Sequence, residues 1–185
     1  MDIRTLFGLS VIMSFIAFGM VTRLYIWPRL RVMSAREALI PLVVVHTFRF
    51  VGLTFLIPGV VSPLLPSDFA APAAYGDLVA AILAVVATLA LSARMSWALL
   101  SVWIFNVWGA ADLLHAIYQG QIHFRIGPGA LGAAFFIPTL VVPPLLVTHG
   151  LIFWLSLRSR HENPQQALRT CTQETIRRSK WKRTA

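Results

Sequence analysis

Long apolar stretches separated by short polar ones dominate the chain. Five stretches are nearly free of charged residues, and they cover residues 6–25, 38–57, 73–93, 97–118 and 130–157. A helix that crosses a lipid bilayer needs roughly 20 consecutive, mostly apolar residues. The pattern therefore predicts an all-α fold, an integral membrane helical bundle with five transmembrane helices. It divides the chain into a spanning domain, residues 1–157, and a basic tail, residues 158–185.

Proline and glycine mark the ends and interruptions of these stretches. The second stretch ends at Pro58-Gly59, and the fifth contains Pro138, Pro143 and Pro144. Proline has no backbone N–H, so each of these prolines removes a hydrogen bond inside a helix. We therefore expect the fifth helix to be proline-broken. Broken helices at membrane depth line cavities or binding sites in many transporters, although a simple kink is the alternative interpretation.

Composition supports lipid as the solvent of this chain. The sequence is 57% hydrophobic and 12% charged, with a mean hydropathy of +0.73, whereas soluble domains are about 25% charged. The single cysteine, Cys171, excludes an intrachain disulfide framework. No hydrolase, zinc-protease or nucleotide-binding motif is present. We therefore predict no catalytic residues and no metal site; if the chain is an enzyme, we expect a membrane redox protein.

Basic residues predict the orientation of the helices. The net charge is +9, and eight of the 16 basic residues lie in the last 28 positions. Four more lie in the loop between the first two stretches, Arg23, Arg29, Arg31 and Arg36. This distribution argues against nucleic acid as a partner and predicts a bacterial cytoplasmic (inner) membrane protein, with its N-terminus outside and its tail in the cytoplasm. The tail is expected to contact anionic lipid of the inner leaflet.

Ionisable residues inside the apolar stretches indicate a polar site. Arg49 and Asp112 lie about 13 Å and about 9 Å below the same predicted membrane face, counting 1.5 Å per residue. We expect them to form an ion pair, with Asp77 as a second acceptor. Such a pair either clamps two helices in register or takes part in ligand or proton handling, and the sequence leaves both interpretations open.

One face of the fourth stretch carries polar groups. Trp108, Asp112 and His115 follow the spacing i, i+4, i+7 and so share a helix face. An aromatic ring, a carboxylate and an imidazole on one face suit a proton path or a polar ligand. For His115, an amphipathic ring at the headgroup level is the favoured alternative.

Two histidines lie at matching depth on different helices. His46 and His149 lie about 13 Å and about 12 Å above the cytoplasmic boundary, counting 1.5 Å per residue. Two such imidazoles are the minimum for bis-histidine ligation of haem b, and Gly52 and Gly150 would admit a flat ring. Histidines that hydrogen-bond across helices are the alternative.

These observations lead to one main hypothesis and two alternatives. The main hypothesis is a ligand- or proton-handling membrane protein whose site comprises Arg49, Asp112, Asp77 and His115. The first alternative is a small b-type cytochrome with His46 and His149 as axial ligands. The second is a non-catalytic subunit or assembly factor of a larger membrane complex. Membrane lipids are the expected partners, and transport by so short a chain would require a homo-oligomer.

Overall fold

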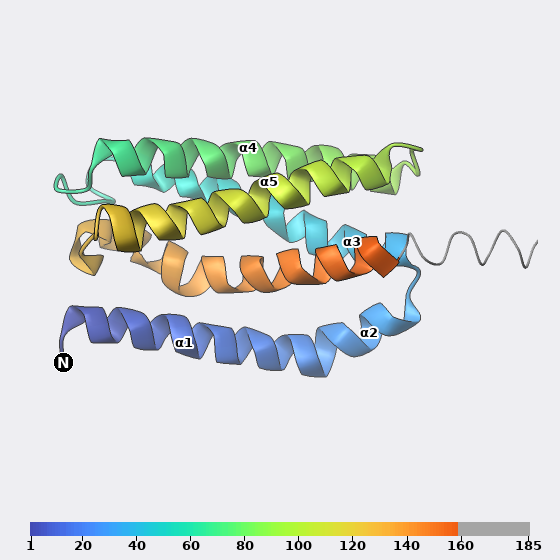
Figure 1. Cartoon of the computed structure of the whole chain (residues 1–185), viewed down its shortest axis with the longest axis horizontal. Coiled ribbons are helices and arrows are strands. Elements are labelled where there is room, and N and C mark those ends of the chain that lie inside the picture. The colour runs from blue at the N-terminus through green and yellow to red at the C-terminus, as the bar shows by residue number, and fades with distance from the viewer. Residues whose placement is uncertain (159–185) are drawn as a thin grey trace, which may run out of the picture.

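The computed structural model describes residues 1–158, which form an elongated helical bundle (Figure 1). Five helices in it are long and apolar enough to cross a membrane, and these are Ile3–Val32, Ala35–Leu56, Ser67–Ser92, Ala98–His123 and Ile137–Arg158. The prediction of an all-helical chain with five candidate spans is therefore confirmed. The predicted basic tail lies outside the described residues from position 159 onward.

The first helix continues past the predicted end at residue 25. It consists of α1 (Ile3–Val21), a π-helical segment η1 (Thr22–Ile26) and α2 (Trp27–Val32). Pro28 lies in the first turn of α2, where a missing N–H is tolerated. Ser34 then caps the next helix, because its Oγ accepts a hydrogen bond from the backbone N–H of Glu37 at 3.4 Å.

The second helix changes its winding halfway along. It begins as α3 (Ala35–Val44) and continues as η2 (Val45–Leu56), a 3-10 helix of 12 residues. A 3-10 helix has three residues per turn, so positions three apart point the same way. The buried residues of η2 are His46, Arg49, Gly52 and Phe55, which follow this spacing without a break. The 3-10 winding thus places all four on the face directed at the bundle interior.

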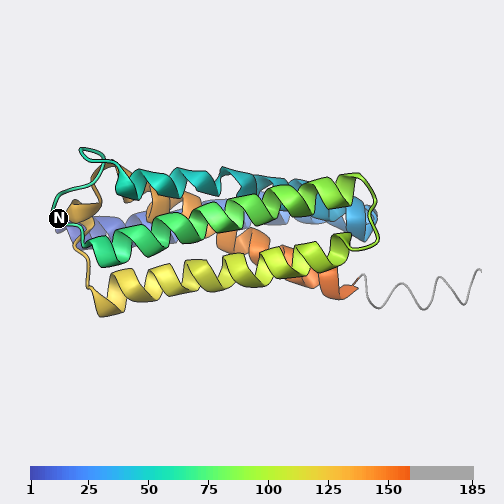
Figure 2. The ribbon, with the colours of Figure 1, turned by 90° about the horizontal axis from the view of Figure 1, so that it is seen from above.

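The helix α4 (Ser67–Ser92) lies between η2 and α5 (Ala98–Tyr118), as Figure 2 shows. Its buried face consists mostly of alanines, and small side chains let helices approach closely in lipid. These buried alanines are Ala70, Ala73, Ala74, Ala80, Ala81, Ala84, Ala87 and Ala90. Asp77 is the acidic residue on this face, so it is brought close to both neighbouring helices.

The chain between the fourth and fifth helices is irregular. The fourth helix ends in a π-helical segment η3 (Gln119–His123), a 3-10 segment η4 (Pro128–Phe135) forms part of the connection, and the fifth helix begins with a π-helical segment η5 (Ile137–Val141). Gly132 has a φ of 52°, and a Cβ there would overlap the carbonyl oxygen of Val60. Ala133 N–H donates to that same oxygen at 2.8 Å. This close approach interrupts the helix, so the fifth helix begins at Ile137 rather than at residue 130.

The prolines of the fifth segment distort its helix at the start. Pro138 lies in the first turn of η5, and the helix regains α geometry from Val142. Thr139 donates its hydroxyl hydrogen to the carbonyl of Phe135 at 2.8 Å, and Thr148 lies 2.9 Å from the carbonyl of Pro144. Threonine hydroxyls therefore satisfy carbonyls near the prolines.

Two apolar clusters fill the bundle on either side of a polar layer. One cluster lies near the connections that precede α4 and the fifth helix, and we call it the loop-end cluster. It includes Phe55, Phe69, Ala74, Leu131 and Ile137. The tail-end cluster includes Leu39, Val43, Val102, Phe105 and Ile152. On η2, α4 and the fifth helix, buried polar residues occupy the positions between these clusters.

Candidate functional site

The guanidinium of Arg49 lies at the centre of the polar layer. Its Nε donates to Asp77 Oδ1 at 2.7 Å, its Nη2 donates to Asp112 Oδ2 at 2.6 Å, and its Nη1 donates to the carbonyl of Gly109 at 3.0 Å. Arg49 is only 1% exposed. We call Arg49, Asp77 and Asp112 the ion triad. With every guanidinium nitrogen already donating to the protein, Arg49 is poorly placed to hold an anionic ligand as well.

Three glycines make room for the ion triad. A Cβ on Gly52 would overlap Asp77, and a Cβ on Gly76 would overlap Asp112. A Cβ on Gly109 would lie 2.8 Å from Arg49 Nη1 and 3.0 Å from His149 Nε2. Each charged side chain of the ion triad thus packs directly against the backbone of a neighbouring helix, as only glycine permits.

His46 and His149 lie between the ion triad and the tail-end cluster, in contact with each other. Their ring centroids are 4.2 Å apart and the rings are tilted by 50°. His149 Nδ1 lies 2.6 Å from Asn106 Oδ1, while Asn106 Nδ2 donates to the backbone carbonyl of His149 at 3.3 Å. Because an amide oxygen only accepts, Nδ1 of His149 carries a hydrogen. His46 Nε2 lies 2.9 Å from the hydroxyl of Thr148.

This geometry does not fit bis-histidine haem ligation. Two imidazoles that bind one iron stand on opposite faces of the macrocycle, each nitrogen about 2 Å from the metal, so their ring centres lie well over 4 Å apart. Rings that are tilted against each other at 4.2 Å leave no space for an iron and its ring. Gly150 lies beside open space rather than in contact with a ring. Within residues 1–158, no three His, Cys, Asp or Glu side chains gather to hold a metal ion.

A large apolar cavity borders the two carboxylates of the ion triad. Its volume is about 560 Å³, which falls within the range of about 300–1,000 Å³ typical of small-molecule sites. It lies between α1, α4, α5 and the segments around η4 and η5. Its walls contain apolar side chains almost throughout, with Asp77 and Asp112 as the acidic residues among those described. The cavity and the ion triad therefore form one site with an apolar body and a charged end.

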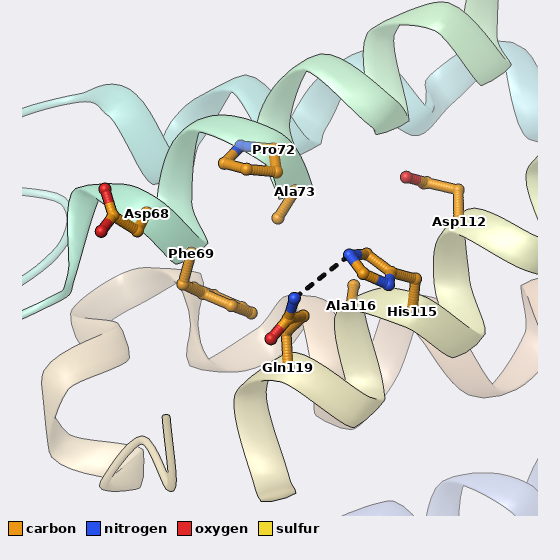
Figure 3. A pocket seen from close by; sticks show the side chains of 8 residues that line it. All are labelled: Asp68, Phe69, Pro72, Ala73, Asp112, His115, Ala116 and Gln119. Carbon is orange, nitrogen blue, oxygen red and sulfur yellow. Dashed lines mark hydrogen bonds between the residues drawn. The ribbon is translucent and has the colours of Figure 1, made fainter. Parts of the chain in front are cut away.

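His115 lies near Asp112 without joining the ion triad. Figure 3 shows Asp112 projecting from α5 towards α4, while the His115 ring faces Gln119, whose amide nitrogen lies 3.4 Å from His115 Nε2. Both Asp112 and His115 line a small pocket of about 20 Å³, room for about one water molecule. Trp108 is 48% exposed. The shared face predicted for α5 is thus mainly its outer face, with Asp112 at the boundary.

The structure brings together five of the six predicted residues and adds others. Arg49, Asp77 and Asp112 are in direct contact, with His46 and His149 one layer beneath. Asn106, Thr148, Gly76 and Gly109 were not predicted to take part, and Gly52 was expected to admit a haem ring rather than to contact Asp77. The sequence does contain one signal for the glycines, because each lies within three positions of a buried charged residue. A small residue there lets a neighbouring helix approach closely. The cavity left no comparable signal in the sequence.

These features define a helical protein with five candidate membrane spans, a buried ion triad and an adjoining apolar cavity. The chain belongs to the family described as "Domain of unknown function (DUF8737)", whose model matches residues 6–157. No curated protein and no solved structure is similar enough to match the chain.

Proposed function

We propose that this membrane protein binds a hydrophobic small molecule in the 560 Å³ cavity, and that the ion triad exchanges a proton as the molecule enters or leaves. The observation that carries the proposal is the position of Asp77 and Asp112 on a mostly apolar wall. Ionised carboxylates in an apolar interior are costly, and ionisable residues inside membrane spans by default suggest a functional site. A purely structural clamp would not need to border a cavity.

A charge count supports the exchange of a proton. Two carboxylates share one guanidinium, so the ion triad has a formal charge of −1 when both carboxylates are ionised. An unbalanced charge in an apolar interior costs several kcal/mol. A proton on Asp77 or Asp112 removes that cost while the cavity holds no counter-ion. Proton uptake and release at this pair is therefore the chemistry that the arrangement favours.

Carbodiimide labelling tests both halves of this proposal. Dicyclohexylcarbodiimide is neutral and hydrophobic. A protonated carboxylic acid adds to it to give an O-acylisourea, which then rearranges to a stable N-acylurea. In membranes that contain the full-length protein, we expect peptide mass spectrometry to find the adduct on Asp77 or Asp112. A water-soluble carbodiimide should label the exposed Asp68 and Glu37 instead.

Two glycines of α1 provide a matched pair of variants. Gly8 lines the cavity, Gly19 does not, and neither has an atom within 4 Å of its Cβ position. Gly8→Trp should fill the cavity and slow the labelling severalfold, whereas Gly19→Trp should leave the rate unchanged. Equal labelling of both variants, or no adduct on either aspartate, would contradict the proposal.

We further propose that the cavity lies at the outer end of the molecule, in a cytoplasmic membrane. The distribution of basic residues supports this orientation. Leu64 and Met95 are exposed, at 84% and 42%, in connections at opposite ends of the bundle. In a Cys171→Ser background, Leu64→Cys should react with an impermeant maleimide in intact cells, and Met95→Cys only after permeabilisation. The reverse pattern would refute the orientation.

A further inference from the structure

The cavity wall is electrically unsymmetrical. At its charged end, Asp77 and Asp112 contribute two formal negative charges, and Arg49 offsets one of them. Arg4 is the basic residue among the described side chains that line the cavity, and it is exposed in the first turn of α1. A ligand deep in the cavity therefore meets a carboxylate before it meets a positive charge.

Aromatic rings form part of the remaining wall. Phe7, Phe15, Phe55 and Phe69 all line the cavity. Phe55 and Phe69 pack edge to face with their centroids 5.9 Å apart, and Phe7 packs in the same way on Phe135 at 5.6 Å. The face of an aromatic ring attracts a cation and repels an anion. A cation that reaches the face of one of these rings is attracted to it, as it is to the carboxylates.

Resting on the proposed function, we propose that the ligand is a lipophilic monocation, such as a quaternary ammonium, a phosphonium or an amine within an apolar frame. The cation enters the cavity, its charge balances the ion triad, and the one proton shared by Asp77 and Asp112 leaves. Charge is conserved in this exchange. A neutral lipid would leave the extra carboxylate unbalanced, and an anion would add to it.

Other charged groups near the pair set the background for its pH dependence. Arg49 faces both carboxylates from η2, and His149 of the fifth helix reaches the same region beside Gly109. Arg4 faces the cavity from α1, and His115 lies on α5 beside the small pocket. Because a proton and the cation compete for one site, the apparent affinity for the cation should rise with pH, by up to about tenfold per unit.

The test compares two ions of nearly the same size and shape and opposite charge. Tetraphenylphosphonium and tetraphenylborate are added separately to full-length protein in nanodiscs, and their protection of Asp77 and Asp112 from dicyclohexylcarbodiimide is measured. We expect tetraphenylphosphonium to protect at a concentration at least about tenfold lower, since it gains both the carboxylate and the ring contacts. Its binding should also release protons into weakly buffered medium.

The outcomes separate this inference from the proposed function. Labelling of the aspartates with equal or better protection by tetraphenylborate overturns the cation and leaves the hydrophobic site standing. Absence of labelling overturns the proposed function itself. Among variants, Asp112→Asn should abolish the proton release on phosphonium binding, because Asp77 is then balanced by Arg49 without a proton, and Arg4→Gln should strengthen phosphonium protection in the otherwise unchanged protein. Glu37→Gln, which removes an exposed carboxylate outside the cavity, is the control and should leave phosphonium protection unchanged.

Discussion

Replacing Gly76 by alanine disturbs the ion triad without altering any of its members. An ideal Cβ at position 76 would overlap Asp112 Oδ1 and lie 2.7 Å from Asp112 Cγ. The Asp112 side chain must therefore move, and its 2.6 Å bond from Arg49 Nη2 is lost or lengthened. A hydrogen bond to a charged group contributes about 1.5–3 kcal/mol to stability. Alanine in place of a helical glycine returns about 1 kcal/mol.

Gly150→Ala is the matched control for this substitution. Gly150 also lies within a helix, and nothing lies within 4 Å of its Cβ position. We expect this variant to gain about 1 kcal/mol and Gly76→Ala to lose about 0.5–2 kcal/mol net. The difference of about 1.5–3 kcal/mol corresponds to about 3–12 °C between their unfolding midpoints. Thermal unfolding of the purified full-length protein, followed by circular dichroism, measures it.

The same substitution in an Asp112→Ala background tests whether Gly76 makes room for Asp112. In Asp112→Ala protein the obstructing carboxylate is absent, so Gly76→Ala should now stabilise as Gly150→Ala does. The resulting coupling energy belongs to the contact between residues 76 and 112. If Gly76→Ala proves as stable as Gly150→Ala in the wild-type background, the glycine does not make room for Asp112, and the close packing inferred for the ion triad is wrong.

Three further predictions concern the polar layer. Arg49→Ala should cost about 3–5 kcal/mol, because it leaves two carboxylates without a counter-charge; Asp112→Ala should cost less, and adding it to Arg49→Ala should restore part of the loss in thermal unfolding. A double variant with additive losses would contradict the pairing. Asn106→Leu should destabilise by about 1–3 kcal/mol, since the N–H of His149 is then buried without a partner; an unchanged unfolding midpoint would refute that bond. Protein expressed with ample haem should show no Soret band, and a band abolished by His46→Ala would overturn the geometric argument against haem.

The hydrophobic pattern and the depth of each residue along its helix were enough to predict much of the structure. Five apolar stretches correspond to five long helices, because residue type determines which segments can lie in lipid. Counting the rise per residue placed Arg49 within reach of Asp112, and the two side chains are in contact. Whether that contact serves ligand exchange stays a prediction. The depth of a residue can be counted along its own helix, so it can be predicted from the sequence.

Lateral position is a different matter, because it depends on how helices pack. Depth alone put His46 and His149 level with each other, which suits either a shared metal or direct contact. The choice of contact depends on Asn106 and Thr148, which orient the rings from α5 and the fifth helix. The cavity depends on the turn at Gly132, where the chain approaches the carbonyl of Val60. Neither arrangement could be predicted from the periodic pattern of a single segment.

The 3-10 winding of η2 determines which of its residues face the bundle interior at each depth. At three residues per turn, His46, Arg49, Gly52 and Phe55 stay aligned, whereas α geometry would rotate each by about 60° from the one before. Converting the 12 residues of η2 to an α-helix would also shorten them by about 6 Å. Gly52 would then leave Asp77, and Arg49 could no longer reach both carboxylates.

Beneath the histidines, the tail-end cluster is closely packed, with Val43, Val102 and Ile152 all 0% exposed. None of the residues of this cluster lines the cavity, so the cluster separates the cavity from the tail end of the bundle. Binding and release from one side require no change in η2. Passage to the other side would require the apolar cluster to open. Rewinding of η2 would break the ion triad and would shift α3, which carries Leu39 and Val43 of that cluster. A 3-10 helix that persists with and without tetraphenylphosphonium would thus favour a binding protein over a transporter.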